Sequence, residues 1–233
     1  MFECKLWCFW GALLALCLAQ PVLAGPAQGN LAALLAQVEE HYAQMHSLEC
    51  QFSQKSRSGG RMRTGRGKAV FFRPADGKNS VIRWEYWAPT VQLIVNDGKE
   101  IRMYTPADNQ LLVSPADALD SDMAYALFTG KSSLASTFQV TAGDSDFRLS
   151  APPAGLQALV LTPKTTQSQL KRAQVWINKD KRIERILMED HFESLTELNF
   201  SEMRFDVIAP DDTKRIEELR TIKTPTGVQV IRQ

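Results

Sequence analysis

The sequence has few of the residues that carry thiol or metal chemistry. Its 233 residues include three histidines and four cysteines. Three of the cysteines, Cys4, Cys8 and Cys17, lie close to the N-terminus, which leaves Cys50 alone in the rest of the chain. One cysteine cannot form an internal disulfide, so the domain must be stabilised by its own core. Cys50 lies beside Phe52 on an alternating segment, which predicts an inert buried thiol.

An excess of charge of one sign is also missing. The chain has 27 Lys and Arg residues against 26 Asp and Glu residues, a formal net charge of +1. This balance argues against a nucleic-acid-binding protein, whose surface would be strongly basic. Residues 56–68 are locally basic and rich in glycine. They predict a solvated hairpin loop, and a docking patch for an anionic partner or a membrane surface is the alternative.

The motifs of common catalytic and metal sites are absent as well. His41 and His46 are five residues apart, whereas metal ligands on one helix face are typically four apart. Residues 130–133 read Gly-Lys-Ser-Ser, but Tyr125 stands where a phosphate-binding loop needs its first glycine. We therefore expect no enzyme activity, no metal and no cofactor, and binding is favoured over catalysis.

The N-terminus has the pattern of a secretory signal peptide. Lys5 precedes an apolar run over residues 6–19, and a small-residue site ends at Ala24. We expect cleavage after Ala24, which would remove residues 1–24 and leave one domain of residues 25–233. The run is short for a transmembrane helix, and an uncleaved signal anchor is the alternative.

Two segments have helical patterns. Residues 30–48 follow the N-cap candidate Asn30 and repeat apolar side chains at helical spacing. Residues 114–130 begin with the N-cap candidate Ser114, and a short helical turn follows near residue 134. The apolar stripe of the first helix contains Leu31, Leu34, Leu35, Val38, Tyr42 and Met45, and that of the second contains Leu119, Met123, Ala126 and Leu127.

Most of the remaining sequence reads as short strands separated by turns. Residues 96–99 form an Asp-Gly hairpin signal between two of these strands. The predicted strands include residues 146–151, residues 214–222 and a short closing strand within residues 224–231. Roughly a dozen such strands predict one large curved sheet or incomplete barrel. Both helices would then bury their apolar stripes against this sheet.

The segment of residues 71–89 is unusually aromatic. In a strand, side chains alternate between the two faces, so Ile82, Trp84 and Tyr86 share one face. The opposite face carries Arg83 and Glu85. Periodicity does not decide whether the aromatic face packs into an ordinary core or lines an apolar cavity.

The order of several motifs resembles the periplasmic outer-membrane lipoprotein carrier family, LolA, across nearly the whole region after the signal peptide. The most specific part is "RWEYWAP" followed by "LIVNDGKEIRMYTPADNQ", which spans residues 83–110 with a short gap. The other matching pieces are "FSQ" at residues 52–54, "RP" at residues 73–74, "LTPK" at residues 161–164 and "TPTGVQVI" at residues 224–231.

The resemblance implies a mainly β fold with helices, a single unclosed (half) β-barrel of about eleven antiparallel strands covered by a helical lid. It also implies a cavity that shields the acyl chains of lipoproteins. Such carriers collect a lipoprotein from an ABC-type exporter in the inner membrane and pass it to an acceptor lipoprotein on the outer membrane. We therefore expect a monomeric periplasmic carrier whose partners are acylated lipoproteins, the exporter and the acceptor.

The resemblance also assigns site residues. By the family's pattern, Arg73 would hold the lid by donating hydrogen bonds to backbone carbonyls of the facing helices. The residues expected to line the cavity come from strands and from both helices. They are Phe52, Phe71, Ile82, Trp84, Tyr86, Ile101, Met103, Leu34, Val38, Leu119 and Met123.

Three departures from the family pattern leave the cargo open. They are the segment of residues 75–81, Arg102, and the charged segment of residues 206–219. The alternatives are a carrier of another envelope lipid or glycolipid, and a lipid-sensing regulatory protein of the same fold. An acceptor of this fold would need a lipid-attachment cysteine, but the large Leu16 precedes Cys17.

Overall fold

The computed structural model describes residues 28–74, 80–116, 133–165 and 169–233, and in these ranges twelve strands form one sheet. The strands are β1 (Ser47–Ser58), β2 (Arg61–Phe72), β3 (Val81–Ala88), β4 (Gln92–Asn96), β5 (Glu100–Thr105), β6 (Gln110–Pro115), β7 (Phe138–Ala142), β8 (Gln157–Pro163), β9 (Leu170–Ile177), β10 (Ile183–Asp190), β11 (Leu195–Phe205) and β12 (Gln229–Arg232). The helices are α1 (Gln28–Gln44), α3 (Leu134–Thr137), α4 (Thr213–Arg220) and the 3-10 turn η1 (Pro106–Asp108).

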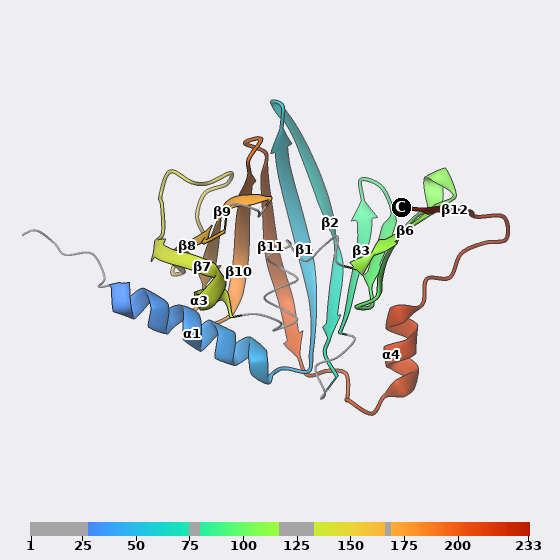
Figure 1. Cartoon of the computed structure of the whole chain (residues 1–233), viewed down its shortest axis with the longest axis horizontal. Helices are drawn as coiled ribbons and strands as arrows, with labels where there is room; N and C mark the ends of the chain where they lie inside the picture. The colour runs from blue at the N-terminus through green and yellow to red at the C-terminus, as the bar shows by residue number, and fades with distance from the viewer. Residues whose placement is uncertain (1–27, 75–79, 117–132, 166–168) are drawn as a thin grey trace, which may run out of the picture.

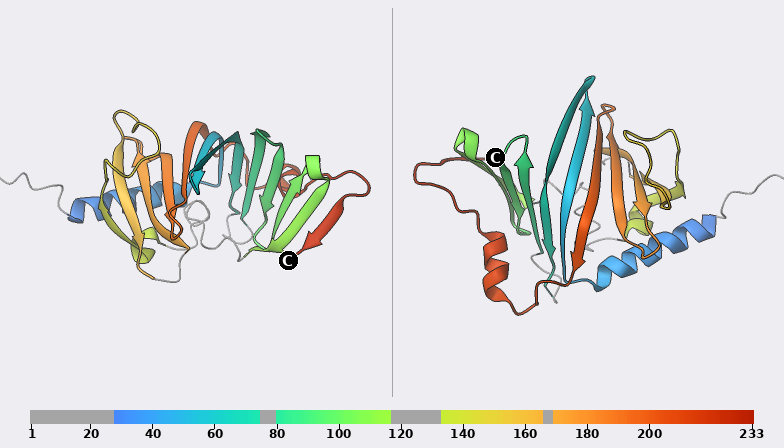
Figure 2. Two further views of the ribbon diagram at one scale, coloured as in Figure 1. Left: turned by 90° about the horizontal axis from the view of Figure 1, so that it is seen from above. Right: turned by 180° about the vertical axis from the view of Figure 1, so that it is seen from behind.

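The sheet is curved and does not close (Figures 1 and 2). Its strand order is β12-β6-β5-β4-β3-β2-β1-β11-β10-β9-β8-β7, so β12 and β7 form the two edges. All neighbouring strands are antiparallel except β12, which pairs with β6 in parallel. The pairing of β1 with β11 joins a wing of β2–β6 to a wing of β7–β10. The predicted fold class, an unclosed and mainly antiparallel half-barrel with few helices, is confirmed.

Each face of the sheet has its own apolar core. On the inner face, the apolar side of α1 shares one core with Phe52 and Phe71, and β7 is the strand that α1 chiefly contacts. On the outer face, α4 packs on Val70, Phe72 and Val95. Figure 1 shows α1 along the β7–β10 wing and α4 beside the opposite wing. Strand alternation therefore assigns successive residues of β2–β5 to two different environments.

The basic stretch is a strand hairpin rather than the predicted loop. Strands β1 and β2 stay paired from Ser47–Phe72 to Ser58–Arg61, and only Gly59 and Gly60 separate them. Both glycines have positive φ angles, +54° and +76°, as a two-residue hairpin turn of this kind requires. The prediction of a loop was wrong because the glycines and charges of residues 56–68 indicate exposure to solvent, which a projecting pair of strands has as well as a loop.

Two predicted strands are also wrong. Residues 146–151 form a loop, and Phe147 of this loop is buried with Trp176 and Leu187 on the outer face. The segment of residues 214–222 is mostly helix α4. Its buried residues Ile216 and Leu219 are three apart, which fits a helix face.

The helix ends also differ from expectation. Helix α1 includes Gln28, so Asn30 lies inside the helix and is not its N-cap. Ser114 and Pro115 belong to the end of β6, and residues 117–130 of the predicted second helix, with Leu119 and Met123, lie outside the described residues. The predicted signal peptide of residues 1–24 lies outside them as well. None of the helices in the described ranges has the length and apolar character needed to span a bilayer.

Candidate functional site

An apolar groove of about 370 Å³ opens on the inner face of the sheet. Residues of β1, β3–β6, β10 and β11 surround it, so both wings contribute. The residues that line it are Gln54, Trp84, Tyr86, Ile94, Ile101, Met103, Leu112, Ser114, Met188, Thr196 and Leu198.

One row of cross-strand neighbours builds most of the groove wall. Trp84 of β3 pairs with Ile94 of β4, Ile94 pairs with Met103 of β5, and Met103 pairs with Leu112 of β6. Residues directly opposite one another in neighbouring strands point to the same face. The four side chains therefore form a continuous apolar row across four strands, and all are only partly buried.

Aromatic contacts support the groove from the β1–β2 side. Phe52 makes edge-to-face contacts with Trp84 and Tyr86, with both ring centroids 4.9 Å away. Phe71 contacts Trp84 in the same way at 5.6 Å. The Tyr86 hydroxyl donates a 2.8 Å hydrogen bond to Gln54 Oε1, which satisfies a polar group beside the apolar wall. Such ring pairs hold the wall in one arrangement.

Arg73 holds the C-terminal end of α1. Its Nη2 donates hydrogen bonds to the carbonyl of Tyr42 at 3.1 Å, to that of Met45 at 2.7 Å, and to that of Ala43. The last carbonyls of a helix lack partners within the helix, so one arginine supplies donors for all three. Partial burial lowers the pKa of the Arg73 guanidinium, and the carboxylate of Asp206 opposes this shift. An arginine nevertheless stays protonated.

Helix α1 has two further polar anchors. The hydroxyl of Tyr42 accepts a 3.0 Å hydrogen bond from the backbone N–H of Ile183 in β10. Burial raises the pKa of the Tyr42 hydroxyl, which stays neutral. Glu39 accepts hydrogen bonds from the backbone N–H groups of Leu134 and Ala135 at the start of α3. In addition to Arg73, α1 is thus held to α3 through Glu39 and to β10 through the side chain of Tyr42.

The predicted cavity residues fall into three groups. Trp84, Tyr86, Ile101 and Met103 line the groove. The others that the structure describes are 7% exposed or less and belong to the inner core beneath the groove and under α1. They are Phe52, Phe71, Ile82, Leu34 and Val38. The remaining two, Leu119 and Met123, lie outside the described residues.

Sequence reasoning missed part of the groove. Ile94 and Leu112 are in register with Trp84 and Met103, so the turn lengths between β3 and β6 would have identified them. Met188 and Leu198 belong to the other wing and reach the groove because β1 pairs with β11. No local pattern contains this long-range pairing.

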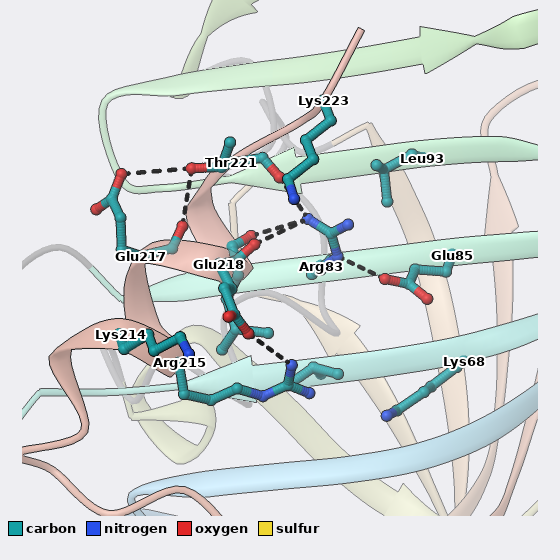
Figure 3. A pocket seen from close by; sticks show the side chains of 12 residues that line it. Lys68, Arg83, Glu85, Leu93, Lys214, Arg215, Glu217, Glu218, Thr221 and Lys223 are labelled. Atoms are coloured by element: carbon teal, nitrogen blue, oxygen red, sulfur yellow. Dashed lines mark hydrogen bonds and ion pairs between the residues drawn. The ribbon is translucent and has the colours of Figure 1, made fainter.

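A larger hollow of about 770 Å³ lies on the outer face, under α4 (Figure 3). Charged side chains dominate its lining, in contrast to the inner groove. Arg83 crosses it and donates hydrogen bonds to the carbonyls of Leu219 at 3.2 Å and Thr221 at 2.9 Å, and its Nε donates to Glu85 at 2.6 Å. Arg83 therefore holds the end of α4 as Arg73 holds the end of α1.

The contacts of Arg83 predict a loss of stability when they are removed. We expect Arg83→Met to lower the free energy of unfolding by about 2 kcal/mol, because charged donors to otherwise unpaired helix carbonyls disappear. Denaturant unfolding followed by circular dichroism measures the change. Lys223→Met is the matched control, since Lys223 lines the same hollow but is exposed. Equal losses in both variants would contradict this role of Arg83.

The described residues contain no cluster of three or more histidine, cysteine or acidic side chains that could hold a metal ion. Burial raises the pKa of the Cys50 thiol to about 12, so it stays protonated near neutral pH. The thiolate is the reactive form of cysteine. Cys50 is thus an unreactive core residue, 3% exposed.

The unclosed sheet and its apolar inner groove define a half-barrel binding protein. The family "Outer membrane lipoprotein carrier protein LolA" matches residues 43–213, and the chain belongs to this family. It is 28% identical over 224 residues to an outer-membrane lipoprotein carrier protein of Chromohalobacter salexigens, covering 96% of this chain and 94% of that one.

A second carrier protein of the same name, from Cupriavidus pinatubonensis, is 29% identical over 227 residues, covering 95% of this chain and 98% of that one. Among solved structures, a LolA superfamily protein from Nitrosomonas europaea is 13% identical, with a TM-score of 0.41 over 82% of this chain and 97% of that chain.

Proposed function

We propose that this protein carries acylated lipoproteins and shields their acyl chains in the inner groove. The groove is the observation that supports the proposal, because it is apolar, partly open and bordered by both wings of the sheet. The names of its full-length relatives agree with this cargo. The outer hollow is larger, but its charged lining does not suit an acyl chain.

The physics of acyl chains explains why a carrier needs such a groove. Burial of one methylene contributes about 0.8 kcal/mol, so a chain of sixteen carbons contributes on the order of 12 kcal/mol. Cargo of this kind cannot cross water unshielded, yet a fully enclosing pocket would retain it. A groove of about 370 Å³ is near the lower end of ligand pockets, which span about 300–1,000 Å³. A lipoprotein with several chains therefore requires the groove to widen.

Arg73 is the residue that we expect to control this widening. It holds carbonyls from Tyr42 to Met45 at the end of α1, whereas Glu39, nearly one turn earlier, is bound to the start of α3. Release of Arg73 would free the helix end without exposing the buried middle of α1. In this scheme Arg73 stabilises the closed, empty form, and entering cargo has to break its hydrogen bonds.

The proposal also includes the setting of the transport. A signal peptide cleaved near Ala24 would place a monomeric carrier in the periplasm. There it would collect lipoproteins from an inner-membrane ABC-type exporter and deliver them to an outer-membrane acceptor lipoprotein. Loading and unloading proceed by transfer of acyl chains between apolar surfaces, and no covalent bond is made or broken.

Mass spectrometry of material bound to the protein tests the cargo. The protein is purified from the periplasmic fraction without detergent, and its bound molecules are extracted and identified. We expect intact lipoproteins with acylated N-termini in amounts comparable to the protein. Recovery of a glycolipid or of free phospholipid alone would overturn the lipoprotein cargo, although the groove would still be a lipid site.

A further inference from the structure

The β1–β2 hairpin ends in an exposed, arginine-rich tip that the groove does not use. Figure 1 shows this hairpin projecting beyond the ends of the other strands, and the view from behind in Figure 2 agrees. Arg57, Arg61 and Arg63 lie within three residues of the turn at Gly59 and Gly60, and all three are exposed. Within the described ranges, none of them forms an ion pair.

The arginines surround the tip instead of lining one side of it. Arg57 pairs with Met62 across the hairpin, so these two share the outer face. Arg61 pairs with Ser58 and Arg63 pairs with Ser56, and these side chains share the inner face. The tip therefore presents positive charge on both faces of the hairpin, with exposed Met62 beside Arg57.

A second tip beside the first adds a fully exposed aromatic side chain. The turn between β10 and β11 carries Phe192, which is 91% exposed, whereas Met62 is 53% exposed. Asp190 orders this turn by accepting hydrogen bonds from the backbone N–H groups of Phe192 and Ser194, both at 2.8 Å. Phe192 is thus displayed on a structured turn and not on a frayed end.

Side-chain hydrogen bonds join the two tips. The Ser58 and Ser194 hydroxyls are 3.0 Å apart, and those of Ser56 and Thr196 are 3.3 Å apart. Arg57 is also in register with Leu195 at the start of β11. The arginines and Phe192 therefore lie on adjacent, hydrogen-bonded tips, which together we call the hairpin-tip surface and which consists of Arg57, Arg61, Met62, Arg63 and Phe192.

We propose that the hairpin-tip surface docks the protein reversibly on a bilayer of anionic phospholipid. An exposed phenylalanine can enter the interface between headgroups and acyl chains, and arginines can keep their guanidinium groups at the phosphates while their stems lie in the apolar region. Each Arg or Lys near an anionic leaflet strengthens binding about fivefold. Three arginines and one phenylalanine favour a weak, reversible contact over permanent anchoring.

The shape of the surface favours a bilayer over an acidic protein segment. A projecting tip with an outward-pointing ring can penetrate a fluid interface, whereas a protein partner would have to provide a matching pocket. The position of the tip also connects it to the groove. Gln54 and Tyr86 line both the groove and a neighbouring hollow that extends to Ser56 and Arg63. Docking would bring this end of the groove to the membrane surface, but the docking itself does not depend on which cargo the groove carries.

Vesicle binding tests the proposal. The protein, purified in the form that cells export, is mixed with vesicles of phosphatidylethanolamine and phosphatidylglycerol, and the bound fraction is measured by flotation. We expect binding to these vesicles and little binding to vesicles of phosphatidylcholine alone. The triple variant Arg57→Gln/Arg61→Gln/Arg63→Gln should lower the partition coefficient about a hundredfold at low salt. Phe192→Ser should lower it about tenfold, with less dependence on salt.

A second triple variant controls for net charge. Lys179, Lys214 and Lys223 are exposed and lie away from both tips, so Lys179→Gln/Lys214→Gln/Lys223→Gln removes the same charge elsewhere. It should bind anionic vesicles within about twofold of the unaltered protein, because charges beyond a Debye length of the bilayer are screened. Equal loss in both triple variants would overturn the proposal, as would failure of the unaltered protein to bind anionic vesicles. If a variant that cannot bind vesicles still yields cargo, the cargo proposal stands, and it is shown to be independent of membrane docking.

Discussion

Arg73→Leu is expected to leave the protein folded and loaded with cargo but to reduce delivery to the acceptor about thirtyfold, because about 2 kcal/mol of closure energy is lost. Arg73 donates to three carbonyls at the end of α1, and leucine can donate to none. The core is expected to stay intact, since Arg73 directly follows β2 and is only partly buried. A loss of this size is smaller than the total stability of about 5–15 kcal/mol of a typical domain.

The direction of the effect follows from competition between closure and cargo. If closure of α1 competes with acyl chains, the apparent affinity for cargo equals the intrinsic affinity multiplied by the open fraction. Loss of Arg73 raises the open fraction, so cargo is held more tightly and release becomes unfavourable. The same change should therefore increase the amount of cargo that co-purifies and decrease the amount that reaches the acceptor.

Transfer from purified, loaded protein to acceptor-containing membranes measures this effect. Arg83→Met is the matched control, since it removes an arginine that holds the end of a helix on the outer face instead of the inner face. It should lose stability and keep normal delivery. Arg73→Lys should be intermediate, because an ammonium group keeps the charge but lacks the planar fork. Normal delivery by Arg73→Leu would contradict the proposed role of Arg73.

On the β2–β6 wing, the alternation of side chains along a strand is enough to predict the face of the sheet on which they lie. Trp84 and Tyr86 were assigned to a different face from Arg83 and Glu85, and the structure has the first pair at the inner groove and the second pair at the outer hollow. The reason is physical, because a strand with period two has no other way to distribute its side chains. Arg83 illustrates the limit, since nothing in its neighbourhood indicates that it reaches the carbonyls of Leu219 and Thr221.

The errors have a common origin in segments where two local patterns compete. Residues 214–222 contain only three apolar positions among charged ones, Ile216, Leu219 and Ile222, and these are too few to separate a strand from a helix. Tertiary contacts settle the choice, because Ile216 and Leu219 reach the outer core only from a helix and Asp212 caps its first turn by accepting from Arg215 N at 3.0 Å. In the β1–β2 hairpin a predicted loop is instead a pair of strands, because backbone pairing continues through a stretch whose composition predicts a loop.

Leu112→Asp is expected to abolish the recovery of acyl-chain cargo, with a fall of at least about fiftyfold in bound lipid. Leu112 ends the apolar row that begins at Trp84, so a carboxylate there would face the acyl chain directly. Burial of an ionised carboxylate against hydrocarbon costs several kcal/mol in proteins, even after relaxation. Because the row is partly open to solvent in the empty protein, the carboxylate is tolerated until cargo covers it, and the penalty falls on binding.

Leu111→Asp provides the matched control for this prediction. Leu111 is the preceding residue on β6 and pairs with Tyr104, so its side chain points to the outer face. Both leucines are half-buried, so the two variants introduce the same carboxylate at similar exposure but on opposite faces of the sheet. Quantitative mass spectrometry of bound lipid should show loss for Leu112→Asp and retention for Leu111→Asp, while their unfolding midpoints stay close together. If both variants kept their cargo, the acyl chains would have to bind elsewhere. If both lost it, the effect would come from a damaged strand and not from the groove.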